Sequence, residues 1–93
     1  MKLKVEFTTK FKKDLKLAQK RNLKTDKLFY IIEKLASSEP LNSKHKDHQL
    51  INYDNKRTTR ECHIEPDWLL IYSINNDKLI LILIRTGSHS DLF

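Results

Sequence analysis

The chain has 93 residues, of which 39% are hydrophobic and 32% are charged, and these proportions fit one globular domain with a modest core. No apolar run approaches the roughly 20 residues that span a membrane, and the lysine-rich N-terminus lacks the apolar stretch of a signal peptide. A single cysteine, Cys62, cannot form an internal disulfide. We therefore expect one cytoplasmic domain over residues 1–93, with Cys62 as a buried, inert thiol.

The net charge of +6 is unevenly distributed along the chain. Residues 1–24 contain nine Lys or Arg against two acidic residues, whereas residues 25–93 are close to neutral. One basic face on a nearly neutral domain indicates a polyanion or an acidic protein as partner. A solvated helix face that only aids solubility is the alternative.

The N-terminal residues predict a strand followed by an amphipathic helix. Residues 3–7 alternate apolar and charged side chains, as in a half-buried strand, and Thr8 or Thr9 can cap a helix. Apolar side chains then recur at helical spacing: Phe7, Phe11, Leu15 and Ala18. The opposite face carries lysines that are available to an anion: Lys10, Lys12, Lys13, Lys16 and Lys20.

A second helix is predicted after a short linker. Thr25 or Asp26 can cap it, an apolar stripe runs through Leu28 and Leu35, and the segment before Pro40 ends it. Because the linker at residues 21–24 is short, the two helices should form an antiparallel hairpin.

The remaining chain reads as strands around one long polar segment. Residues 41–58 lack a clear period, and such a segment in a compact domain is usually functional or mobile. Strands are expected at residues 48–51, 59–65, 68–74 and 79–84, with a hairpin turn at 75–78. This order predicts an α+β fold that begins with an N-terminal strand and packs the antiparallel helical hairpin on one face of a mainly antiparallel four- to five-stranded sheet.

Titratable side chains cluster near the ends of the predicted strands. His48, His63 and His89 can converge at one end or face of the sheet if the last strands are neighbours. Two imidazoles can serve as base and acid near neutral pH, a carboxylate can fix a tautomer, and Arg60 or Arg85 can bind a phosphate. These groups suffice to transfer a phosphodiester within RNA without a metal.

Other interpretations of these residues are open at this point. Three histidines and an aspartate could bind zinc, but no HxxxH or HxH pair and no second cysteine support a site, so we expect no cofactor. Each histidine alone could be an ordinary surface residue. Gly87, the chain's single glycine, suggests a required backbone conformation, and Phe93 is either core or a platform for a base.

Three motifs together resemble the YafQ-type toxins of the RelE/ParE superfamily. They are Asp47-His48-x-Leu50, Arg60-Glu61-Cys62-His63-Ile64-x-Pro66-Asp67-Trp68-Leu69-Leu70-Ile71-Tyr72 and Arg85-Thr86-Gly87-Ser88-His89-Ser90-Asp91-Leu92-Phe93. The resemblance extends over nearly the whole chain. It implies a bacterial type II toxin that cuts mRNA in the ribosomal decoding site and is neutralised by a cognate antitoxin with a DNA-binding domain, in a complex that regulates its own operon.

The resemblance also implies a set of active-site residues. His48, His63, Asp67 and His89 correspond to the catalytic positions, and Glu61 and Phe93 support catalysis or the RNA. His89 would be the general acid and His48 the general base, although the division between base and stabiliser stays open because coupled groups titrate together. The lysine-rich first helix would contact ribosomal RNA.

Two departures from the family pattern stand out. Relatives often have a glycine-containing turn where this chain has Tyr53-Asp54-Asn55-Lys56-Arg57, and some have Asp in place of Glu61. Two other functions are also compatible with the residues: a ParE-like inhibitor of DNA gyrase on the same fold, and a non-catalytic RNA-binding module.

Overall fold

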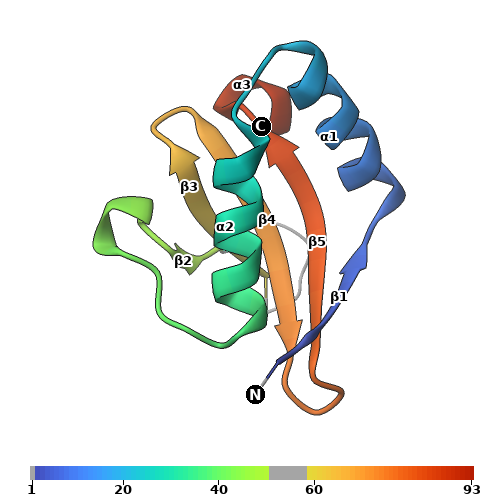
Figure 1. The fold of residues 1–93 in the computed structure, drawn as a ribbon, viewed down its shortest axis with the longest axis vertical. Helices are drawn as coiled ribbons and strands as arrows, with labels where there is room; N and C mark the ends of the chain where they lie inside the picture. The colour runs from blue at the N-terminus through green and yellow to red at the C-terminus, as the bar shows by residue number, and fades with distance from the viewer. Residues whose placement is uncertain (1, 51–58) are drawn as a thin grey trace.

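The computed structural model describes residues 2–50 and 59–93 and forms a five-stranded mixed sheet with helices on one face (Figure 1). The elements in chain order are β1 (Lys4–Phe7), α1 (Thr9–Lys20), α2 (Thr25–Ala36), the 3-10 turn η1 (Ser43–His45), β2 (His48–Gln49), β3 (Thr59–Glu65), β4 (Trp68–Asn75), β5 (Ile80–Gly87) and α3 (His89–Leu92). The strand order is β1-β5-β4-β3-β2, with β1 parallel to β5 and the other pairs antiparallel. The predicted α+β architecture is confirmed.

The two long helices form largely as their sequence predicts. Thr8 is extended and its side chain accepts a hydrogen bond from the Phe11 amide at 3.0 Å, so it caps α1. Phe11 and Ala18 are the buried residues of α1. This helix runs in the opposite direction to α2 (Figure 1). The expected side-chain cap of α2 is wrong: its N-cap residue is Lys24, which makes no such bond.

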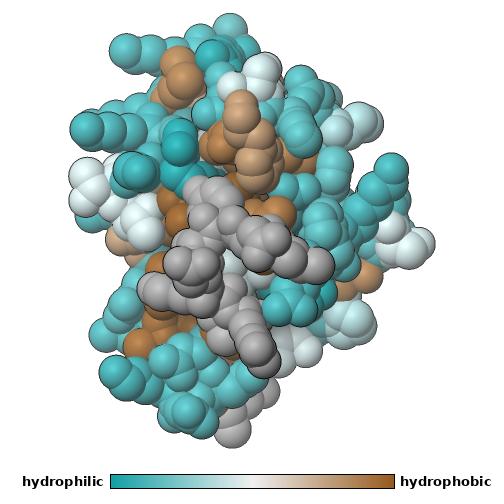
Figure 2. Space-filling view, turned by 180° about the vertical axis from the view of Figure 1, so that it is seen from behind, coloured by the Kyte–Doolittle hydropathy of each residue, from teal (hydrophilic) through white to brown (hydrophobic). Residues whose placement is uncertain are grey.

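Strand alternation divides the sheet into two chemically different faces. Cys62, Ile64 and Tyr72 belong to the core cluster under the helices, together with Leu81 and Leu83. Successive side chains of a strand point to opposite faces, so the residues between them in β3 lie on the other face. Seen from behind, apolar groups emerge above and to the left of the grey atoms, within a mostly hydrophilic surface (Figure 2).

The prediction for the cysteine is confirmed. Cys62 is a free thiol with no exposed surface, and burial raises the pKa of this thiol to about 12. The nucleophilic thiolate is therefore not populated at neutral pH, and Cys62 acts as a small apolar side chain.

The strand bounds differ from prediction mainly at β5. Leu79 has a positive φ of 56° and belongs to the turn, in which the Asn75 Oδ1 accepts a hydrogen bond from the Lys78 amide. The strand then continues to Gly87, because Leu69 of β4 still pairs with that residue. A short strand near residue 48 is confirmed as β2, whereas Ile51 and the Tyr53–Arg57 turn lie outside the described residues.

The reason expected for Gly87 is wrong. Its backbone does not have a positive φ. A Cβ atom at this position would instead lie 3.1 Å from the Cβ of Asp91 and 3.2 Å from its Oδ2. The glycine therefore provides space for the C-terminal helix α3 to pack close to the end of β5.

Within the described residues, none of the helices has the length and apolar character that crossing a membrane would need.

Candidate active site

Two of the predicted histidines flank one buried carboxylate. His48 of β2 pairs with Glu61 of β3, and His63 lies two residues further along the same face of β3. The Glu61 Oε1 is 3.7 Å from the Nε2 of His48 and 3.7 Å from the Nε2 of His63. Glu61 is only 7% exposed, so solvent screens its charge weakly. A proton on either ring therefore creates an imidazolium beside a fixed negative charge.

The hydrogen bonds of the two rings define which nitrogen can exchange a proton. The Nδ1 of His48 lies 2.7 Å from the Lys46 carbonyl, and the Nδ1 of His63 lies 3.2 Å from the Pro66 carbonyl. Because a carbonyl can only accept, each Nδ1 carries a hydrogen and donates it. In each neutral ring, Nε2 is then the unprotonated nitrogen. Both proton-accepting atoms therefore face Glu61.

The C-terminal residues form a second group next to this one. The Asp67 Oδ1 accepts a hydrogen bond of 3.1 Å from the His89 amide, which connects the β3–β4 turn to α3. The imidazole of His89 lies against the ring of Phe93, with 5.0 Å between ring centroids. Phe93 is 58% exposed, so the core alternative for this residue is wrong.

A series of contacts connects the six predicted residues into one network. It runs from His48 through Glu61 to His63, whose ring bonds the carbonyl beside Asp67, and from Asp67 to α3 with His89 and Phe93. The pairing register supports the same arrangement, since His63 pairs with Leu69 and Leu69 with Gly87. His63 and Gly87 are thus about 10 Å apart, two strand spacings.

The two arginines predicted to bind phosphate do not join this chain of contacts. Arg60 lies opposite Tyr72, on the helix side of the sheet, and donates to both carboxylate oxygens of Asp47 at 3.3 and 3.2 Å. It therefore lies apart from the cluster of His48, Glu61 and His63, and its role in substrate binding stays a prediction. Arg85 donates to both oxygens of Asp14 at 2.7 and 3.0 Å, so the structure gives it a partner in α1.

The Asp47 carboxylate also accepts a short hydrogen bond of 2.5 Å from the Tyr72 hydroxyl. Burial and this carboxylate raise the pKa of Tyr72 above its ordinary value. Asp47 directly precedes His48, so these bonds anchor the start of β2 to the core side of β3 and β4.

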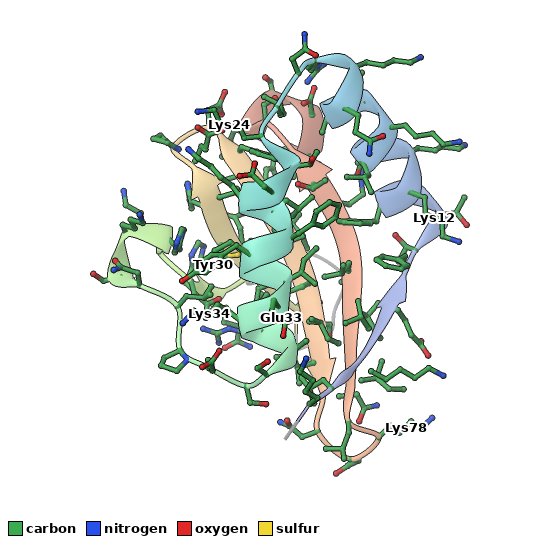
Figure 3. The ribbon with its side chains drawn as sticks, viewed as in Figure 1. Lys12, Lys24, Tyr30, Glu33, Lys34 and Lys78 are labelled. Atoms are coloured by element: carbon green, nitrogen blue, oxygen red, sulfur yellow. The ribbon has the colours of Figure 1, made fainter. Side chains whose placement is uncertain are left out.

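The predicted lysine face is present on α1. Lys10, Lys12, Lys13, Lys16 and Lys20 are all exposed, and Lys12 extends away from the sheet (Figure 3). Because α1 lies on the helix side of the sheet and Glu61 and His63 lie on the other face, this lysine face is separate from the histidine cluster, and its contact with RNA stays a prediction.

Sequence reasoning missed several residues that support the site. The fourth histidine, His45, is 9% exposed and donates from Nδ1 to the His63 carbonyl at 2.7 Å, so it fixes the backbone of a site residue. Ion pairs from α1 to β5 and α3 were also missed.

Within residues 2–50 and 59–93, no group of three or more His, Cys, Asp or Glu is arranged to hold a metal ion.

Comparison with known proteins defines the class. A family model described as a bacterial toxin of type II toxin-antitoxin systems, YafQ, matches residues 3–93. The chain is 43% identical over 90 residues to the mRNA interferase toxin YafQ of Escherichia coli (strain B / BL21-DE3), covering 96% of this chain and 94% of that protein. The chain therefore belongs to the YafQ family of type II toxins.

Solved structures agree with this assignment. A metal-bound toxin from Helicobacter pylori superimposes with a TM-score of 0.90 at 43% identity, covering 98% of this chain and 99% of the other. YafQ in the E. coli DinJ-YafQ toxin-antitoxin complex superimposes with a TM-score of 0.88 at 37% identity, covering 100% and 99%. The predicted family and fold are confirmed.

Proposed function

We propose that this chain is an mRNA endoribonuclease that cuts messenger RNA on the ribosome in the cytoplasm and thereby inhibits translation and growth. The observation that carries the proposal is the pair of histidines whose Nε2 atoms share the Glu61 carboxylate. A gyrase inhibitor or a passive RNA-binding module has no use for two proton-accepting nitrogens beside one buried charge. The interferase activity named for the E. coli relative agrees with this chemistry.

The proposed reaction transfers a phosphodiester within the RNA. His48 Nε2 removes the proton from a ribose 2′-OH, the 2′-oxygen bonds to the adjacent phosphorus, and the bond from phosphorus to the 5′-oxygen breaks. His89 donates a proton to the leaving 5′-oxygen. The products are a 2′,3′-cyclic phosphate and a 5′-hydroxyl, so no water, metal or redox partner is consumed.

The neighbouring residues have supporting roles in this proposal. Glu61 stabilises the imidazolium that forms at His48 or His63, and His63 offers a second cation to the phosphorane oxygens. Asp67 holds the first amide of the helix that carries His89. Phe93, exposed beside His89, stacks on a base of the substrate.

The partners follow from the charge distribution and the family. The exposed lysines of α1 bind ribosomal RNA, which is a dense polyanion. A cognate antitoxin neutralises the toxin, as in the complex of the E. coli relative with DinJ, and a DNA-binding domain of that antitoxin lets the complex regulate its own operon.

A cleavage assay with purified protein tests the proposal. Wild type should cut mRNA bound to ribosomes and leave 5′-hydroxyl ends, with the same rate after the purified toxin has been stripped of metal with EDTA and the chelator removed, and His89→Ala should cut at least about 100-fold more slowly. Equal cleavage by His89→Ala would refute the assigned chemistry. Growth arrest with an SOS response and intact mRNA would favour gyrase inhibition instead.

A further inference from the structure

The C-terminal helix α3 is too short to hold its own position. It has only four residues, His89–Leu92, and isolated helices of this length are not stable in water. None of its residues is buried. The location of His89 and Phe93 must therefore be fixed by contacts from elsewhere.

Asp91 is the centre of those contacts. Its Oδ2 accepts a hydrogen bond of 3.0 Å from the Ser88 amide, and its own amide donates to the Ser88 hydroxyl at 3.2 Å, which completes a capping box. The same Oδ2 accepts a hydrogen bond of 2.8 Å from Arg21 Nη1. The helix is thus closed locally and tied to a residue 70 positions away.

Arg21 is itself held at the end of α1. It is the C-cap residue, and its amide bonds the Leu17 carbonyl at 3.0 Å. Two turns earlier, Asp14 accepts from the Arg85 guanidinium and from the Thr86 amide. Residues seven apart lie on one helix face, so Asp14 and Arg21 form one stripe that holds the segment from Arg85 to Asp91.

We propose that Arg21 and Asp91 are positioning residues that place His89 and Phe93 for catalysis. The inference rests on the proposed function. Neither residue touches the substrate: Arg21 acts through Asp91, Asp91 acts through the helix, and Asp67 holds the opposite end of the same segment by the His89 amide. Misplacing a catalytic group by about 1 Å can cost on the order of 100-fold in rate.

Kinetics separate positioning from simple charge. Arg21→Ala should lower kcat about tenfold or more with KM within about twofold of wild type, and Arg21→Lys should recover most of the loss. The matched control is Lys24→Ala, which also removes one positive charge, at the start of α2 (Figure 3). This change breaks no capping hydrogen bond, because the Lys24 side chain makes none. Equal losses in Arg21→Ala and Lys24→Ala would overturn the proposal, because they would indicate a general charge effect on RNA binding.

A double-mutant cycle tests whether the two residues act together. Asp91→Asn retains an acceptor for the Ser88 amide but loses the charge that faces Arg21. Combining it with Arg21→Ala should cost no more than Asp91→Asn alone. Additive losses would overturn the proposal, and so would unfolding of Arg21→Ala under assay conditions, since the pair would then be structural.

An NMR measurement on the protein alone makes the inference independent of the cleavage activity. The Phe93 ring lies 5.0 Å from His89, so the Cε1–H resonance of His89 reports their arrangement through the ring current. Arg21→Ala and Asp91→Asn should shift this resonance and leave that of His63 in place. If wild type cuts no RNA, the proposed function fails, whereas an unchanged His89 resonance in both variants would overturn the positioning role itself.

Discussion

Replacing Glu61 by glutamine removes the charge that the two histidines share while keeping the shape of the side chain. The carboxylate oxygen is 3.7 Å from each Nε2. Two opposite unit charges about 4 Å apart attract each other by about 4 kcal/mol at an effective dielectric constant of 20 and by about 1 kcal/mol in water. The His48 side chain is 51% exposed and that of His63 is 24% exposed, which places the interaction between these limits. We expect the barrier to rise by about 2 kcal/mol, or roughly 30-fold in kcat.

The assay is single-turnover cleavage of ribosome-bound mRNA at saturating toxin, which reports the chemical step rather than binding. Glu65→Gln is the control, because it makes the same charge change on β3 at a residue that pairs with Lys27 at 3.3 Å outside the cluster. It should retain the wild-type rate. A Glu61→Gln rate within about twofold of the control would refute the idea that this carboxylate stabilises a catalytic imidazolium.

Three further predictions concern stability and reactivity. Asp14→Asn should lower the free energy of unfolding by about 2 kcal/mol in urea denaturation, because the partly buried Arg85 loses its charged partner, and an unchanged midpoint would contradict this. Arg21 first, and then the hydrogen bonds with Ser88, lower the pKa of Asp91 from 3.8 to about 2, so this carboxylate stabilises the fold above pH 3.8 and the benefit is lost as the pH falls towards 2. The difference in melting temperature between wild type and Asp91→Asn should therefore shrink over this range, and a constant difference would argue against the ion pair. Iodoacetamide at mildly alkaline pH should modify Cys62 only after unfolding, since burial raises its pKa to about 12, and rapid labelling of the native protein would show that the thiol is accessible.

The local sequence patterns predicted most of the fold because they depend on neighbouring residues. Alternation gave β3 its observed bounds, Thr59–Glu65, and Thr8 capped α1 as expected. The α2 cap and the end of β5 were missed. The length of β5 depends on pairing between Leu69 and Gly87, which no local pattern contains.

The site was predictable as a set of residue types but less so as a geometry. Arg60 and Glu61 are neighbours in one strand, so they had to face opposite sides of the sheet, and the period of two could have excluded one of them from the site. The pairing of His48 with Glu61 depends on the register between β2 and β3. The segment that connects these two strands includes residues that the structure does not describe. The Arg21–Asp91 pair joins positions 70 apart and follows only from the tertiary fold.

Gly87 shows that a glycine can be required at a position for either of two physical reasons, its backbone conformation or the space that its missing side chain leaves. A lone glycine near the end of a strand suggested a required backbone conformation, yet Gly87 has no positive φ. Its role depends on the close approach of Asp91, which is visible only once α3 is placed. The resemblance in sequence could supply residue identities but not this packing.

The most direct test of the central claim is to map mRNA 5′-hydroxyl ends across the transcriptome after induction of wild type and of His89→Ala. Histidine-catalysed attack by the 2′-OH predicts new 5′-hydroxyl ends within translated reading frames for wild type and none above background for His89→Ala. Growth arrest without new ends, or the same ends in both strains, would contradict the account.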